Sequence, residues 1–339
     1  MRSVELTASK HIRPFAAFLA NHGESVQPLL DRAGLPGTCL EHPETLVPTA
    51  ALWRFRELAA KRTGLSNLTL QVMVPLALPQ LGRVGRALVC APTLASAIRD
   101  FQRLARKESS TTILELSSCG DGSVFFSNRF KLRGEEGEWH AELYVLSWML
   151  KIVRFFAPSW SPTEISCMAS ATPERLRAIE SLATRALFGR RCSGFPLPAS
   201  MLPLSPCSNE TRGRRPVDDD LLWAVVPSDS AAGATAQLIR AYADDRWLTL
   251  QEASDLLGMS LRTLQRQLSA EGRTYSEILA QARLEVARDL LRGSDASLSD
   301  LASQLGYSSL TNFNRAFRGW AAVSPREFRA AGQAPGIRA

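Results

Sequence analysis

Two short segments near the end of the chain carry side chains whose hydrogen-bonding groups match the edges of nucleic-acid bases. Arginine donates two parallel hydrogen bonds to guanine, and asparagine or glutamine pairs with adenine in the same two-point manner. The first segment holds Arg262, Thr263, Gln265 and Arg266, and the second holds Thr311, Asn312, Asn314 and Arg315. Because residues three and four apart share one face of a helix, we predict that both sets contact double-stranded DNA in the major groove.

The two segments belong to two copies of one sequence pattern. Thr249–Ser260 returns 48 positions later as Ser297–Ser308. Each copy starts with a threonine or serine followed three residues later by an acidic residue, which is the pattern of a capping box. Two residues before its end, each copy has a glycine that can end the first helix. The cap pairs are Thr249 with Glu252 and Ser297 with Asp300, and the glycines are Gly258 and Gly306. We therefore predict two helix-turn-helix units.

The second helix of each unit is expected to bury one face and leave the other for DNA. Apolar residues at three- and four-residue spacing define the buried face. They are Leu261, Leu264 and Leu268 in the first unit, and Leu310, Phe313 and Phe317 in the second. Residues 275–291, between the units, contain no proline or glycine and predict one helix. At ~1.5 Å per residue it spans ~25 Å, which holds the two reading helices near the ~34 Å separation of successive major grooves.

These motifs resemble the DNA-binding domain of the AraC/XylS family of transcription regulators over residues 233–335. The resemblance rests on Ser260–Arg266, Ala282–Leu291, Leu301–Tyr307 and the closing segment Asn314–Arg329. One departure is Trp320–Ala322, where the family usually has a glycine before its Val-Ser-Pro turn. An ordinary bundle of helical hairpins with solvated arginines is the alternative interpretation. Two copies in register, together with the closing segment, argue against it.

Upstream, residues 1–205 are predicted to form a separate α+β domain with helices and a small antiparallel sheet. A linker over 206–232, rich in proline, glycine and clustered charge, then leads to an all-α domain over 233–335. The helices of the first domain are expected at 9–21, 49–62, 93–107, 138–156 and 173–188, with strands at 111–116, 123–130 and 163–169. The 138–156 helix is apolar on nearly all sides, so it should be buried.

This order of elements resembles the effector domain labelled arabinose-binding in one branch of the same family, whose members answer to unrelated ligands. The resemblance rests on Gly82–Ala97, the hairpin, Glu142 and Trp160–Ile165. It implies a small-molecule effector of unknown identity, a homodimer in which the effector changes the placement of the DNA-binding domains, and RNA polymerase as a further partner.

The first candidates for an effector site lie on the predicted 138–156 helix. His140, Tyr144 and Trp148 recur four residues apart, and Lys151 follows close to the same face. Amphipathic core residues with satisfied polar tips explain the same spacing, so both interpretations stay open. Arg190 and Arg191 are candidates for binding an anionic ligand, with a solvated charge pair as the alternative.

Composition limits the other functional classes. The 339 residues suggest about two domains, and the net charge of +7 favours a polyanionic partner. The sequence has no signal peptide and no 18-residue apolar run, so we expect a cytoplasmic protein without a membrane partner. The six cysteines form no Cys-x-x-Cys pair and the four histidines are scattered. We therefore expect no metal, no cofactor and no enzyme activity.

Together these features predict a sequence-specific transcriptional regulator that responds to a small-molecule effector. The alternative is a ligand-independent DNA-binding protein, constitutive or architectural, whose first domain only dimerises. A ligand that stabilises residues 1–205 distinguishes the two hypotheses.

Overall fold

The computed structural model describes residues 4–206 and 225–333. Contacts between residues divide the chain into two compact units, Met1–Asp229 and Ser230–Ala339. Most of the predicted linker, 206–232, lies outside the described residues. Its last two residues are helical, because α9 (Ala231–Tyr242) begins there with the Ser230 hydroxyl as its cap.

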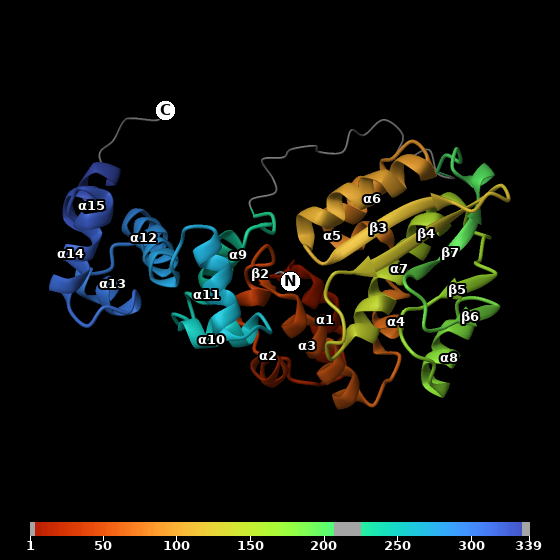
Figure 1. The fold of residues 1–339 in the computed structure, drawn as a ribbon, viewed down its shortest axis with the longest axis horizontal. Coiled ribbons are helices and arrows are strands. Elements are labelled where there is room, and N and C mark those ends of the chain that lie inside the picture. Colours follow the sequence, from red (N-terminus) through yellow and green to blue (C-terminus); the bar gives the residue numbers. More distant parts are fainter. Residues whose placement is uncertain (1–3, 207–224, 334–339) are drawn as a thin grey trace. The chain divides into compact units, whose positions relative to one another are not determined.

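A five-stranded sheet forms one layer of the first unit (Figure 1). The strand order is β3-β4-β7-β5-β6, and neighbouring strands are antiparallel except β5 and β6, which are parallel. The predicted antiparallel sheet is therefore confirmed, with one parallel pair at its edge. The strands are β3 (Thr112–Ser118), β4 (Ser123–Phe130), β5 (Glu164–Ser166), β6 (Arg185–Leu187) and β7 (Ser193–Pro198).

Strand β7 is absent from the elements expected from sequence, because prolines such as Pro196 and Pro198 are rare inside a sheet. It nevertheless pairs with β4 over its whole length. The Ala199 amide donates to the Gly122 carbonyl next to β4, so by alternation along the strand the nitrogens of Pro196 and Pro198 face the β5 side. Pairing with β5 is confined to Gly194, so no N–H is required of either proline there. A Cβ at Gly194 would lie 2.2 Å from the carbonyl oxygen of Phe126, so the close approach of β7 to β4 requires glycine there.

The expected helix over 173–188 is wrong beyond Glu180. Helix α8 (Pro173–Glu180) ends at that residue, and Arg185–Leu187 forms β6. The segment between them buries Leu182 and Ala183, so the apolar spacing that suggests a longer helix instead anchors a turn. Pairing of β6 with β5 outweighs the local helix propensity.

Helix α7 (Glu138–Phe156) is the central helix of the first unit. Fifteen of its 19 residues are buried, as its apolar sequence predicts. It packs on β4 and β7 on one side and on α3 (Thr49–Thr63), α4 (Leu68–Met73) and α6 (Leu94–Glu108) on the others. Within the described ranges, no helix combines the length and apolarity needed to cross a membrane.

Glu142 fixes α7 against the sheet. The side chain is fully buried, and its carboxylate accepts hydrogen bonds from the Met168 amide at 2.6 Å, the Ala169 amide at 3.1 Å and the Ser193 hydroxyl at 2.5 Å. Burial raises the pKa of this carboxyl group, while the three bonds act in the opposite direction. Glu142 therefore joins α7 to the segment after β5 and to the start of β7.

The remaining elements of the first unit bring its start close to the end of α6. β1 (Leu6–Ala8) pairs with β2 (Leu46–Pro48), and Thr7 forms a bridge with Ser109. The other helices are η1 (Ser9–Ile12), α1 (Arg13–Asn21), α2 (Gln27–Ala33), η2 (Gly37–Leu40), η3 (Leu78–Leu81), α5 (Gly82–Val89) and η4 (Ala199–Met201).

In the second compact unit, Ser230–Ala339, all secondary-structure elements of the described residues are helices. The expected helix between the two helix-turn-helix units is confirmed as α12 (Tyr275–Gly293), and it packs against α9 and against α15 (Pro325–Gln333). The first unit of the pair is α10 (Leu250–Leu256) with α11 (Leu261–Ala270), and the second is α13 (Leu298–Gln304) with α14 (Leu310–Ala321).

Candidate functional site

Side-chain caps fix the start of each helix in the two helix-turn-helix units. The Ser260 and Ser309 hydroxyls accept the amide hydrogens of Thr263 and Asn312, each at 3.2 Å. Thr249 and Glu252 form the predicted reciprocal capping box. In the second helix-turn-helix unit, the Asp300 carboxylate instead accepts from the hydroxyl of Ser297, at 2.7 Å.

The interior of both reading helices is buried as expected, but their first residues are not. Leu264 and Leu268 of α11 are buried, as are Phe313 and Phe317 of α14. Leu261 is half-buried, and Leu310, expected in the core, is 37% exposed. Both stand at the first helical position, before the helix reaches the core formed by its next turns.

Helix α11 exposes three of the four side chains predicted to contact DNA. Arg262, Gln265 and Arg266 are exposed, and no ion pair joins either arginine to a residue in the described part of the chain. Thr263 is half-buried, and its hydroxyl lies 2.8 Å from that of Ser260. The two arginines and the glutamine are thus available to a ligand, while Thr263 also completes the helix cap.

Helix α14 holds its arginine in a defined position. Thr311 and Arg315 are exposed, and Asn312 and Asn314 are half-exposed. The Asn312 amide donates to the Ser308 hydroxyl at 3.0 Å and accepts from Arg315 Nη2 at 3.2 Å. This pair of hydrogen bonds orients the guanidinium before any base is present, which reduces the entropy lost on binding.

The two helix-turn-helix units are tied together by more than α12. Trp247, before α10, donates from Nε1 to the carbonyl oxygen of Gln304 at the end of α13, at 2.9 Å. The guanidinium of Arg283 on α12 lies 5.2 Å from the Trp247 ring and 5.5 Å from the Tyr307 ring. Gly306 has φ +75°, and a Cβ there would lie 3.1 Å from both Arg283 and Trp247, so the backbone conformation and this contact both favour glycine.

The effector candidates predicted from sequence do not form one group. Tyr144 and Trp148 line a common cavity. His140 is buried elsewhere, with Nδ1 3.1 Å from the Thr69 hydroxyl, and burial lowers its pKa to about 4 with help from nearby arginines. Its 3.7 Å contact with Glu57 is therefore not an ion pair at neutral pH.

The three cationic candidates also lie away from that cavity. Lys151 donates to the carbonyl oxygens of Val74 and Leu76, at 3.1 and 2.5 Å, and so caps the end of α4. Arg190 and Arg191 are exposed in the turn between β6 and β7. The structure thus gives Lys151 a structural contact and leaves the arginine pair on the surface.

The cavity that Tyr144 and Trp148 line has a volume of about 60 Å³ and lies among α3, α6, α7 and β1. Its wall is mainly apolar. Three ionisable side chains that the sequence analysis does not identify, His11, Arg56 and Glu108, also line it.

Arg56 is the least expected of these residues, because its guanidinium is buried without a counter-charge. The side chain is 3% exposed, and its Nε has no hydrogen-bond partner. Its Cζ lies 4.1 Å from the centre of the Tyr144 ring and 5.0 Å from that of Phe15. A desolvated cation–π contact contributes about 2 kcal/mol, whereas burial of an unpaired ion costs several kcal/mol. Burial accordingly lowers the pKa of Arg56 to about 10.

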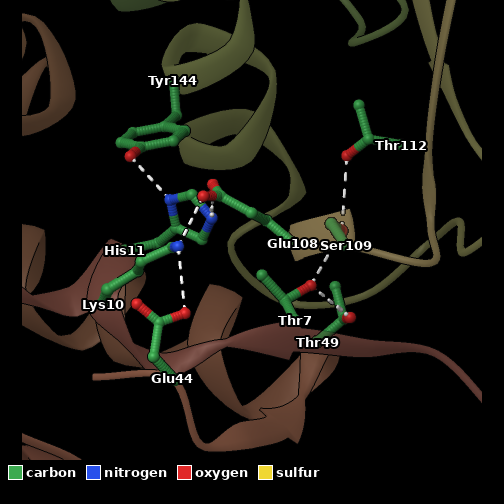
Figure 2. A network of polar contacts seen from close by, with 9 residues as sticks. All are labelled: Thr7, Lys10, His11, Glu44, Thr49, Glu108, Ser109, Thr112 and Tyr144. Atoms are coloured by element: carbon green, nitrogen blue, oxygen red, sulfur yellow. Dashed lines mark hydrogen bonds and ion pairs between the residues drawn. The ribbon is translucent and has the colours of Figure 1, made fainter. Parts of the chain in front are cut away.

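Glu108, by contrast, is fully paired (Figure 2). One carboxylate oxygen lies 2.5 Å from Lys10 Nζ and the other 3.2 Å from His11 Nε2. Burial favours the neutral form of Glu108, but His11 and Lys10 outweigh it and lower its pKa. His11 continues the network through Nδ1, 2.9 Å from the Tyr144 hydroxyl. The negative charge in the cavity wall is therefore satisfied internally.

Comparison with known proteins identifies the kind of domain in each of the two compact units. The model of the arabinose-binding domain of AraC transcription regulators matches residues 23–205, and that of a helix-turn-helix domain matches residues 253–331. The chain belongs to the AraC family of transcription regulators. It is thus a DNA-binding transcriptional regulator with an N-terminal domain of the arabinose-binding type.

Two relatives and one solved structure illustrate the similarity of this chain to other transcriptional regulators. An uncharacterized HTH-type transcriptional regulator of Mycobacterium tuberculosis is 24% identical over 308 residues, which is 87% of this chain and 89% of the relative. VirS of the same species is 31% identical over 160 residues, 46% of each chain. The crystal structure of the transcriptional regulator CdpR of Pseudomonas aeruginosa covers 95% of this chain and 98% of its own, at 19% identity and a TM-score of 0.39.

The departure from the AraC family pattern at Trp320–Ala322 has a clear backbone consequence. Ala322 ends α14 with φ +59°, and it is the one non-glycine residue in the described ranges with positive φ. A side chain in this left-handed conformation costs roughly 1 kcal/mol relative to glycine. The turn therefore forms without the family's usual glycine, but under strain.

We expect Ala322→Gly to raise the free energy of unfolding of the compact unit Ser230–Ala339 by about 1 kcal/mol, because glycine adopts this left-handed conformation without strain. Thermal denaturation of the full chain measures it, with Ala321→Gly as the control. That control places glycine inside α14 and should destabilise it by about 1 kcal/mol. An equal effect of the two changes would contradict the strain at Ala322.

Proposed function

We propose that this AraC-family regulator changes its affinity for operator DNA when a small molecule binds within residues 1–205. The proposal assigns effector binding and dimerisation to residues 1–205, a linker to 206–232 and DNA reading to 233–335. The single observation that supports it best is the cavity among α3, α6 and α7, with a buried and unpaired arginine in its wall. A domain that only dimerised would not need such a residue.

The side chains proposed to read DNA are those predicted from sequence. They are Arg262, Thr263, Gln265 and Arg266 on α11, and Thr311, Asn312, Asn314 and Arg315 on α14. Capped helix starts and buried opposite faces support their orientation. From the family we further propose a homodimer that binds two half-sites and contacts RNA polymerase on DNA.

A fragment of residues 228–339 tests the division of labour. It includes Ser230, the cap of α9, and we expect it to bind a single half-site. It should bind the full operator more weakly than the whole chain does, because the dimer gains from a raised effective concentration. Its affinity should not change with effector, since an effector acts only through differential binding to two states and the fragment lacks that site.

The measurement is a titration of operator DNA with the fragment and with the full chain, each with and without effector. Equal affinity of the two proteins would remove the case for dimerisation through residues 1–205. An effector response that survives in the fragment would place the effector site within residues 228–339. A full chain that no small molecule affects would favour the ligand-independent alternative.

A further inference from the structure

The strongest unexplained feature of the first unit is the electrostatic imbalance at its internal cavity. Arg56 enters from α3 with 3% of its surface exposed, its buried Nε has no hydrogen-bond partner, and no ion pair joins it to an acidic side chain of the described ranges. The one carboxylate among the lining residues, Glu108, has one oxygen on Lys10 and the other on His11 (Figure 2). Glu108 is therefore occupied by Lys10 and His11, and no acidic side chain of the cavity wall is left to pair with Arg56.

The rest of the wall indicates the body of the ligand. Most lining side chains are apolar and belong to α3, α5, α6 and α7. They include Leu52, Trp53, Val84, Phe101, Val145 and Trp148. An apolar wall favours a ligand whose remaining atoms are hydrocarbon, because a strongly hydrated anion such as phosphate would lose its water without replacement hydrogen bonds.

The size of the cavity limits the ligand. Its volume is about 60 Å³, whereas a buried cavity of roughly 150 Å³ holds benzene. In proportion, this cavity has room for about two or three non-hydrogen atoms. That is a carboxylate group with at most one further carbon atom, and a longer acyl chain does not fit without rearrangement of the wall. Arginine suits the carboxylate, since its planar fork donates two parallel hydrogen bonds to it.

From this geometry we infer that the cavity binds a short-chain organic acid, with the carboxylate on Arg56 and the hydrocarbon part against α5, α6 and α7. This inference rests on the proposed function in one respect: the acid acts as the effector. Because the ligand contacts α3, α6 and α7 at once, its binding stabilises their mutual packing. The Tyr144 ring, whose centre lies 4.1 Å from Arg56 Cζ, adds a cation–π contact that holds the guanidinium at the cavity wall.

The test is the thermal melting of the full chain with formate or acetate, compared with formamide or acetamide at the same concentration. The acids should raise the melting temperature, and the amides, which have the same shape without the charge, should not. Inorganic phosphate should also have no effect. Equal shifts with acid and amide, or no shift with any acid, would overturn the inference.

Two variants locate the effect. Arg56→Met keeps the unbranched apolar stem of the side chain and removes the charge, so it should melt at a higher temperature without ligand and lose the response to acids. Arg62→Met is the matched control, because Arg62 lies on the same helix with its side chain 63% exposed and paired with Glu24. It should respond as the parent does. If Arg56→Met keeps the acid-induced shift, the carboxylate is not bound by Arg56.

Operator titration separates this inference from the proposed function. If acetate raises the melting temperature through Arg56 but leaves the affinity for operator unchanged, the site stands and the effector response fails. If instead a neutral compound changes operator affinity equally in the parent and in Arg56→Met, the effector response stands and the carboxylate site is wrong.

Discussion

A single alanine inserted after Val286 is expected to weaken specific binding about 100-fold or more. The insertion rotates the second helix-turn-helix unit, α13 and α14, by ~100° about the axis of α12 and shifts it by ~1.5 Å along that axis. The reading faces of α11 and α14 then no longer face one side of the duplex, so the base contacts of one helix are lost, at ~1 to 3 kcal/mol each. Gel-shift titration with operator DNA measures the change.

The contacts between the two helix-turn-helix units sharpen this prediction. Arg283 precedes the insertion, and its partner ring on Tyr307 follows it, so the Trp247–Arg283–Tyr307 contact must break when the helix is lengthened. Val286→Ala is the control, because it changes the same turn of α12 without changing its register, and it should bind operator like the parent. An insertion variant with full affinity would mean that α14 contributes little to recognition.

The helices and strands that the sequence predicts best are those whose signals are local. Helix α7 is apolar nearly throughout, and α12 runs from a capping box to Gly293 without proline or glycine, so both are apparent from their own residues. Strands β6 and β7 are not. β6 lies in a helix-favouring segment and β7 contains two prolines, and each forms because of a partner strand distant in sequence.

The same distinction separates the two candidate sites. The residues proposed to read DNA lie near the start of a capped helix in each helix-turn-helix unit, so spacing alone predicts that they share one face. Arg56 and Glu108 lie on the apolar stripes of α3 and α6, and a charged residue on such a stripe is a local signal that can be found in the sequence. That Arg56 meets Tyr144 while Glu108 meets Lys10 and His11 depends on how three helices and the N-terminal segment pack together, which spacing does not show.

Simultaneous replacement of Arg266 and Arg315 by alanine is expected to reduce specific affinity by ~2 to 6 kcal/mol, the sum of ~1 to 3 kcal/mol for each arginine. The effects should add, since the two residues lie in different helix-turn-helix units and share no partner. Arg315→Ala should also release Asn312, whose amide then loses one of its two hydrogen bonds. Titrations of each single variant and of the double variant with operator and with unrelated DNA measure these changes.

Arg240→Ala provides the matched control, because it removes the same charge from α9, where Arg240 pairs with Glu285 and Asp289. It should lower affinity slightly and equally for every sequence, since a lost positive charge weakens attraction to phosphates in general. The double variant should instead lose its preference for operator while its binding to unrelated DNA changes little. If the double variant loses affinity equally on all sequences, with a shallower dependence on salt, then Arg266 and Arg315 contact only phosphates and the reading of bases lies with other side chains of α11 and α14.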